Sequence, residues 1–484
     1  IQSVETASTY TILAKSFSNA TLKFTNLAST SSDSGNGGSS TVGVYQINTG
    51  VTSATSFEGW GASGWGAGPF NTGQTSVEEL RVWSQQNFGE DLIFGYRNGP
   101  VYYWDASNTL STRAVELSSL SGASAVPTIQ NFILVSDINR FVFCFGTTPI
   151  GSATKDPMII RWSDQEDATN WTPAATNQAG SLRLSRGTEI VAAAQARQEV
   201  LVWTDSSLYS LQYVGAGSGV WAAQLVGEQI SIASQNSVAY ASGVSYWMGK
   251  DKFYMYDGST QPLQCDLRKY VFTDFNTEQY NQVFGGSNEA FNEVWWFYCS
   301  SSATDNDSYV VYNYLEHIWY YGSMARSAWL DSGLRAFPLA ATFNSVLVNH
   351  EEGVDDNETG TTAAIPAFIT SADFDLEDGD RFMLMSRVLP DVSFEGSTAA
   401  NPAITMSFFP LTSSGSGYNS PTSESGVSTG VATRSATSPV EVYTSQIHTR
   451  VRGRQVSMKI ESSAAGVQWQ SGATRIDIRP DGRR

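Results

Sequence analysis

The chain is 484 residues long, with 41% hydrophobic side chains and only 15% charged ones. This balance excludes an intrinsically disordered protein and predicts a packed core, divided over roughly two to four domains at about 100–200 residues each. The net charge of −18 excludes a protein that grips nucleic-acid phosphates, because that affinity comes from lysine and arginine displacing counterions.

The local patterns are those of short β-strands. Aromatic residues make up 12% of the chain and there are 42 glycines, which is typical of strands joined by tight turns. A polar loop is expected at Thr30–Thr41, and short helices are expected only at Val77–Gln85 and Asp274–Gln282. Most of the remaining chain alternates between apolar and polar residues with a period of two.

A hairpin pattern then recurs: an apolar strand, a small polar turn, and an aromatic strand that ends near Asp or Gly. The copies are Asp91–Asp105; Arg140–Phe145 with Met158–Asp164; Glu199–Tyr213; Val244–Gly258; and Glu293–Tyr298 with Ser308–Tyr314 and His317–Tyr321. Their spacing of about 45–60 residues is the scale of one four-stranded propeller blade. The sequence therefore predicts an all-β protein with a β-propeller-like domain, the alternative being an irregular set of β-sandwich hairpins.

The composition changes near Asn349, where an acidic and polar stretch begins. We predict a propeller-like domain at 1–349, an acidic linker or loop at 350–366, and a second antiparallel β domain at the C-terminus, 367–484. Ser413–Thr437 is too polar to pack and is predicted to be an extended loop. Strands of the second domain are expected at Ala367–Ser371, Phe382–Met385, Arg387–Phe394, Ala403–Phe409 and Arg454–Ile460.

Catalytic and metal-binding patterns are weak. The three histidines are scattered, and the three cysteines lie in or beside apolar runs without CxxC spacing, so neither a zinc site nor a disulfide framework is expected. Ser163–Trp171 is similar to a sialidase Asp box but lacks its glycine, and a polar turn pinned by Trp162 and Trp171 is the favoured interpretation. We therefore expect no enzyme activity, cofactor or metal ion.

The densest acidic run of the C-terminal part is a candidate site. The acidic run at Asp373, Asp375, Glu377, Asp378 and Asp380 is similar to a calcium loop but has the wrong residues at the turn and closing positions, which favours a solvated turn.

Two tryptophans and a basic tail are candidates for contacts with other proteins. Trp60 and Trp65 lie in the glycine-rich segment Gly59–Phe70 and either dock on a neighbouring subunit or fold back onto their own domain. The basic tail with Arg479, Arg483 and Arg484 either pairs with an acidic partner or is solvated.

No apolar run reaches the roughly 18 residues that a membrane span needs, so no membrane insertion is expected. No signal peptide is visible at Ile1, and because the chain opens mid-pattern without Met, we expect its native N-terminus to lie further upstream.

Several of these stretches together resemble one group of proteins, the tail nozzle or packaged-DNA-stabilisation proteins of podoviruses, the short-tailed double-stranded DNA phages. The resemblance covers most of Leu80–Tyr321 and the C-terminus, whereas residues 1–79 match poorly. The stretches that carry it are Leu80–Phe94 with Tyr102–Asp105, Ile160–Trp171, Leu201–Tyr209, Trp247–Gly258 and Arg475–Arg484.

The resemblance implies a structural component of the virion: a homohexameric nozzle below the portal that retains packaged DNA and conducts it during ejection. Its implied partners are a tail adaptor and tail needle, fibre or tailspike proteins, with double-stranded DNA as a passing, non-specific cargo. An acidic lumen would repel phosphates, and the run from Asp373 to Asp380 is the candidate lining. The alternatives are a receptor- or glycan-binding tail protein and a degraded glycosidase.

Overall fold

A computed structural model describes Ser53 and residues 80–482, except for 109–111, 138, 216–218, 334, 377–378 and 412–434. The described chain is almost entirely antiparallel β-structure, as predicted. It divides into two compact units. Unit 1 takes the described residues up to Phe284 together with Tyr298–Asp307, and unit 2 takes Gly285–Phe297 and the described residues from Ser308 onward.

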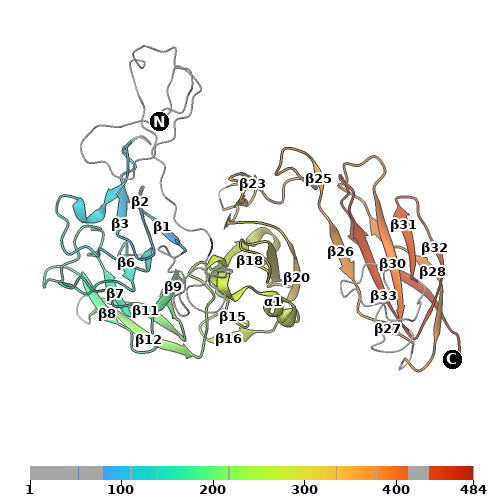
Figure 1. Ribbon diagram of the computed structural model, residues 1–484, viewed down its shortest axis with the longest axis horizontal. Coiled ribbons are helices and arrows are strands. Elements are labelled where there is room, and N and C mark those ends of the chain that lie inside the picture. Colours follow the sequence, from blue (N-terminus) through green and yellow to red (C-terminus); the bar gives the residue numbers. More distant parts are fainter. Residues whose placement is uncertain are drawn as a thin grey trace, which may run out of the picture. The chain divides into compact units, whose positions relative to one another are not determined.

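Five four-stranded sheets follow one another along the chain, each with its strands in sequence order (Figure 1). The first is β1–β4 (Trp83–Phe88, Asp91–Tyr96, Val101–Trp104, Val115–Glu116) and the second is β5–β8 (Phe132–Val135, Val142–Phe145, Ile159–Trp162, Gly180–Arg183). The third is β9–β12 (Ile190–Gln195, Val200–Thr204, Ser207–Gly215, Val220–Glu228) and the fourth is β13–β16 (Val238–Ala241, Val244–Met248, Phe253–Tyr256, Thr260–Leu263). The fifth is β17–β20 (Phe284–Asn288, Glu293–Tyr298, Ser308–Asn313, Ile318–Ser323). This succession of four-stranded meanders makes the domain β-propeller-like. The predicted hairpin copies form the two central strands of the first four blades and β18–β20 of the fifth.

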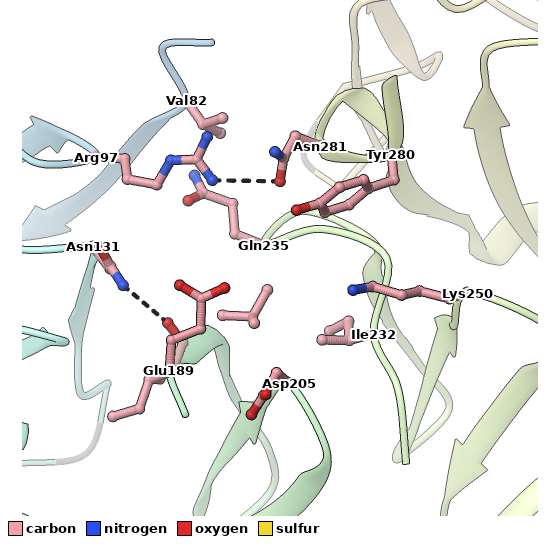
Figure 2. A pocket seen from close by; sticks show the side chains of 12 residues that line it. Val82, Arg97, Asn131, Glu189, Asp205, Ile232, Gln235, Lys250, Tyr280 and Asn281 are labelled. Atoms are coloured by element: carbon pink, nitrogen blue, oxygen red, sulfur yellow. Dashed lines mark hydrogen bonds between the residues drawn. The ribbon is translucent and has the colours of Figure 1, made fainter. Parts of the chain in front are cut away.

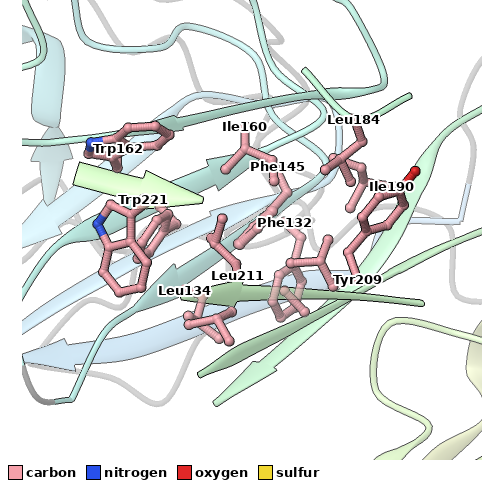
Figure 3. Close-up of a cluster of buried hydrophobic side chains, with 14 of the residues drawn as sticks. Phe132, Leu134, Phe145, Ile160, Trp162, Leu184, Ile190, Tyr209, Leu211 and Trp221 are labelled. Atoms are coloured by element: carbon pink, nitrogen blue, oxygen red, sulfur yellow. The ribbon is translucent and has the colours of Figure 1, made fainter. Parts of the chain in front are cut away.

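Neighbouring blades in unit 1 pack face to face through shared apolar clusters. Strand β10 shows how the sequence encodes this: Val200 and Val202 point into the cluster shared with the second blade, while Leu201 and Trp203 point into the cluster shared with the fourth. Figure 3 shows the first of these clusters, in which side chains of the second and third blades interdigitate. A strand buried on both faces needs a continuous apolar run, which is why Val200–Trp203 lacks the usual alternation.

One expected helix is wrong. Val77–Gln85 was expected to be helical, but β1 begins at Trp83, and residues 77–79 lie outside the described residues. Two polar side chains of this strand accept hydrogen bonds from the next blade. Ser84 Oγ accepts a hydrogen bond from the amide of Ile133 at 3.1 Å, and Gln86 Oε1 accepts one from the amide of Val135 at 2.9 Å. Tertiary hydrogen bonding therefore overrides the local preference.

The second expected helix is displaced rather than absent. Asp274–Gln282 contains a 3₁₀ helix at Thr277–Gln282, but the α-helix, α1, lies just before it at Arg268–Asp274. The other described helical turns are the 3₁₀ segments Leu117–Ser119 and Glu289–Phe291.

In unit 2 a three-stranded sheet contains β21 (Ala328–Leu330), β22 (Leu339–Ala341) and β23 (Leu347–Asn349). The predicted acidic linker, 350–366, contains the paired strands β24 (Asp355–Asp356) and β25 (Ala363–Ala364). The units divide near Phe284 and not at this segment, and the predicted domain boundaries stay predictions.

The C-terminal strands form the predicted second antiparallel β domain. One sheet runs β26–β33–β30–β31, with β27 also on β33, and a second runs β32–β28–β35; β29 pairs with β34. The bounds are β26 Ala367–Thr370, β27 Phe374–Asp375, β28 Met383–Leu389, β29 Val392–Ser393, β30 Ala403–Leu411, β31 Ala436–Glu441, β32 Ile447–Gly453, β33 Gln455–Ser462, β34 Gln470–Ser471 and β35 Arg475–Pro480. Alternate residues of β30, namely Ile404, Met406 and Phe408, face the side chains of β28 in one core.

Candidate functional site

The described part of unit 1 has a cavity where successive blades begin (Figure 2). It measures about 490 Å³, counting the solvent at its open mouth. Blade-start residues and inter-strand turns line it because each blade directs its innermost strand toward the same axis. The lining residues with polar side chains are Arg97, Asn131, Glu189, Asp205, Gln235, Lys250, Tyr280 and Asn281.

Several of these side chains fasten the first blade to much later segments. Arg97 donates from Nη1 to Asn281 Oδ1 at 3.3 Å and from Nη2 to the Leu80 carbonyl at 3.1 Å. Gln235 donates from Nε2 to the carbonyl of Trp83 at 3.0 Å, across 152 residues of sequence. The cavity wall therefore also holds the first blade against the segments that precede and follow the fourth blade.

The charged groups of the cavity have mixed signs. Asp205 accepts hydrogen bonds from the amide and the hydroxyl of Thr188, both at 2.8 Å. Burial alone would raise the pKa of Asp205, but these hydrogen bonds outweigh it and hold the pKa below its usual value. Lys250 places its ammonium 4.9 Å from the ring centre of Tyr280. Asp205 is thus held as a carboxylate, which suits an ionic or polar contact and not a general acid.

The lining of this cavity offers charged and polar groups that differ in exposure. Glu189 and Lys250 are exposed, and Asn131 is buried with its Nδ2 donating to the Ile190 carbonyl at 3.3 Å. Neither serine, cysteine nor histidine lies among these lining residues, so the cavity lacks the pairing of a serine or cysteine with a histidine base. The arrangement can accept a small polar molecule, and it ties the first blade to later segments of unit 1.

The acidic run predicted as a channel lining lies in unit 2. Asp373 and Asp380 are exposed, and Asp375 in β27 accepts a hydrogen bond from Gln455 Nε2 at 3.2 Å. Glu377 and Asp378 lie outside the described residues. The channel role of the run stays a prediction.

The predicted interface residues are mostly beyond what the structure describes. Trp60, Trp65, Arg483 and Arg484 lie outside the described residues, and Arg479 is exposed on β35, where its backbone pairs with Leu384 of β28. Their role in subunit contacts stays a prediction.

The turn that resembles an Asp box uses its carboxylates locally. Asp164 Oδ1 accepts the amides of Gln165 and Gln178, each at 2.8 Å, and Asp167 Oδ1 accepts the amide of Thr169 at 2.9 Å. Trp171 is fully buried and donates to the Ala168 carbonyl at 2.8 Å. The expected polar turn pinned by tryptophan is confirmed.

Cys144 and Cys299 are buried and Cys265 is half-buried, all three as free thiols. Burial raises the pKa of Cys144 to about 12, so it behaves as the small apolar side chain that the sequence indicated. In the described ranges, no three His, Cys, Asp or Glu side chains gather as metal ligands would. No helix in the described part of the chain has the length and apolar character required to span a membrane.

Sequence reasoning missed a buried polar cluster in unit 2. Arg326 pairs with Glu358 at 2.9 Å, and its Nε donates to His350 Nε2 at 3.0 Å. Burial, followed by the Arg326 guanidinium, lowers the pKa of His350 to about 4. No local motif marks these residues, because only the fold brings the three segments together.

A second carboxylate missed from sequence is Glu293 on β18. It accepts hydrogen bonds from Trp295 Nε1 at 2.9 Å and from the Tyr320 hydroxyl. Burial raises the pKa of Glu293, although both hydrogen bonds act in the opposite direction. It anchors two strands of one sheet.

Sequence reasoning also missed an apolar surface on the sheet β21–β23. Its inner positions include Trp329, which stacks on Trp295 with ring centres 5.3 Å apart. The opposite face points to solvent and is called the β21–β23 outer face here; it consists of Ala328, Leu330, Leu339, Ala341, Leu347 and Asn349. Five of the six are apolar, whereas a solvent-facing side of an antiparallel sheet normally carries polar residues.

No family model matches the sequence, and no curated protein matches it. Solved structures with partial similarity include Hsv2 of Kluyveromyces lactis, 10% identical over 55% of this chain and 73% of that one, with a TM-score of 0.31. BamB of Moraxella catarrhalis is 10% identical over 55% of this chain and 80% of its own, also at 0.31. An apocarotenoid oxygenase of Synechocystis is 7% identical over 60% and 72%, at 0.32. Similarity this low carries no argument about function.

Proposed function

We propose that this chain is a structural component of a phage tail, a non-enzymatic subunit of a ring-shaped nozzle that retains packaged DNA and conducts it during ejection. The observation that carries the proposal is the β21–β23 outer face. Covering an apolar sheet face gains free energy, at about 25 cal/mol per Å², so such a face suits a subunit that works beside neighbours.

Two further features support the same function. The stretches between Leu80 and Tyr321 resemble podovirus nozzle proteins, and these stretches include strands of the blades. A net charge of −18 per subunit also suits a conduit for DNA, because a negative wall repels phosphates and does not retain them.

Electron microscopy tests this function directly. We expect the purified chain to form six-fold rings in negative stain at micromolar concentration, and phage particles carrying a tagged copy to show the tag on the tail axis. A chain that sediments as a monomer at all concentrations and labels no axial density would refute the proposal. Binding of the isolated chain to host polysaccharide would instead support a receptor- or glycan-binding tail protein.

A further inference from the structure

We infer that the cavity of unit 1 binds a small zwitterion, a molecule that carries one ammonium and one carboxylate group. The inference goes beyond the proposed function, because neither ring formation nor the passage of DNA requires a site for a small molecule. The charged side chains of the lining, and the partners that each of them has or lacks, lead to this class of ligand.

The cavity has the dimensions and the mixed lining of a small-molecule site. Its volume of about 490 Å³ includes the solvent at its mouth, and protein sites for small molecules measure about 300–1,000 Å³. Apolar wall comes from Val82, Ile190, Val191 and Ile232. The charged groups come from the first, third and fourth blades, so a bound molecule would contact several blades at once.

Two charged residues of the lining are held by uncharged partners. Arg97 donates to Asn281 and to the Leu80 carbonyl, and Asp205 accepts the amide and the hydroxyl of Thr188. Neither Arg97 nor Asp205 forms an ion pair with any residue that the structure describes. Their charges are therefore fixed in position and are not neutralised by the protein.

Lys250 and Glu189 line the same cavity without neutralising each other. Both are exposed, and within the described ranges neither belongs to an ion pair. The Lys250 ammonium lies 4.9 Å from the ring centre of Tyr280. Figure 2 shows Lys250 and Glu189 extending toward the cavity from different sides. Two opposite charges that face one space and stay apart leave room for a ligand that pairs with both.

Gln235 adds a hydrogen-bond acceptor to the lining. Its side chain is more than nine-tenths buried, with an exposed fraction of 8%. Because its Nε2 donates to the carbonyl of Trp83 at 3.0 Å, the orientation of the amide is fixed. No described residue donates to its Oε1. A buried acceptor without a protein partner suits a ligand that donates hydrogen bonds, such as an ammonium group.

The signs of the charges determine the class of ligand. Glu189 and Asp205 would repel a simple anion such as phosphate. Arg97 and Lys250 would likewise repel a simple cation. The four charges sum to zero, so a molecule without net charge meets no overall repulsion. A zwitterion also pairs its carboxylate with Lys250 and its ammonium with Glu189, and such charge-assisted hydrogen bonds are stronger than those of a neutral polyol.

Isothermal titration calorimetry of the full chain tests the class of ligand. Glycine, β-alanine and γ-aminobutyrate are the probes, because their two charges lie at increasing separations, and butyrate and butylamine are the controls with one charge each. The binding free energy of a small ligand is limited by its number of atoms, so the probes are titrated at millimolar concentration. We expect at least one zwitterion to bind at least about tenfold more tightly than both controls.

Two substitutions test whether the zwitterion occupies this cavity. Glu189→Gln and Lys250→Gln each remove one charge from an exposed position, and each should weaken binding of the zwitterion by at least about tenfold. Glu189→Gln should also strengthen the binding of butyrate, because it removes a repelling carboxylate. Circular dichroism checks that each variant is folded.

Glu166→Gln and Lys269→Gln are the matched control variants. Both side chains are exposed in unit 1 and lie outside the lining of the cavity, so these variants should bind the zwitterion like the wild type.

Three results would overturn the inference: no heat of binding with any of the zwitterions, equal binding of a zwitterion and a control with one charge, or unchanged binding in both cavity variants. Each of them leaves the nozzle function standing, because ring formation decides that function. A chain that binds a zwitterion in the cavity and never forms rings would instead refute the nozzle function and support this site.

Discussion

The ion pair between Arg326 and Glu358 offers the sharpest test of the structure, because it anchors the acidic segment that the sequence indicated to be a linker. The side chains of Arg326 and Glu358 are only 9% and 16% exposed, so solvent screens the pair little. Glu358→Ala leaves the guanidinium buried with the neutral His350 beside it. Removing one partner of a buried pair costs about 3–5 kcal/mol.

For a unit of this size that cost lowers the unfolding midpoint of unit 2 by roughly 6–20 °C. The assay is thermal unfolding followed by tryptophan fluorescence, since Trp329 lies 4.7 Å from the His350 ring, centre to centre. Glu352→Ala is the control, because Glu352 is an exposed carboxylate of the same segment. Replacing Arg326 and Glu358 together with methionine should restore most of the stability, because no buried charge is then left alone.

A loss below about 1 kcal/mol would refute this reasoning, because that is the value of a solvent-exposed pair. A segment that acts as a free linker would give that result.

Three further predictions follow from individual side chains. Because burial raises the folded-state pKa of Glu293, the contribution of this side chain to stability is present below its unfolded pKa of about 4.3 and is lost as pH rises through the folded value. Urea unfolding of the wild type and of Glu293→Gln should therefore show that the variant becomes relatively more stable with rising pH. A stability difference that stays constant with pH would contradict this. Trp203→Ala, between two blades, should cost about 3–5 kcal/mol by chemical unfolding, with Arg197→Ala as a surface control and a loss under 1 kcal/mol as the contrary result. Replacing Asp373 and Asp380 with lysine should slow DNA release from particles. Higher salt should restore the release rate, since screening shortens the reach of these charges to about 8 Å at physiological ionic strength. A release rate that does not respond to the substitutions at any salt concentration would show that these residues do not line the channel.

The β class of this protein and its blade hairpins could be predicted from sequence because they depend on local patterns. Val200–Trp203 is apolar at every position and is followed by a tight turn and an aromatic strand, and such a run is buried on both faces wherever it occurs. The same reasoning located most C-terminal strands, since Ile404, Met406 and Phe408 alternate with a period of two.

Other features depended on the tertiary structure. The strand at Trp83–Phe88 forms because Ser84 and Gln86 satisfy backbone amides of the second blade, which no local window contains. Arg326 meets Glu358 across 32 residues, and Arg97 meets Asn281 across 184.

The β21–β23 outer face is the clearest case. In the sequence, Leu330 and Leu347 are ordinary apolar residues of short strands, indistinguishable from core residues. Strand register turns them to solvent while Trp329 and Val348 turn inward, and register is set by pairing between strands rather than by either strand alone. Local periodicity therefore determined which segments became strands, and long-range pairing decided which of their faces point to solvent.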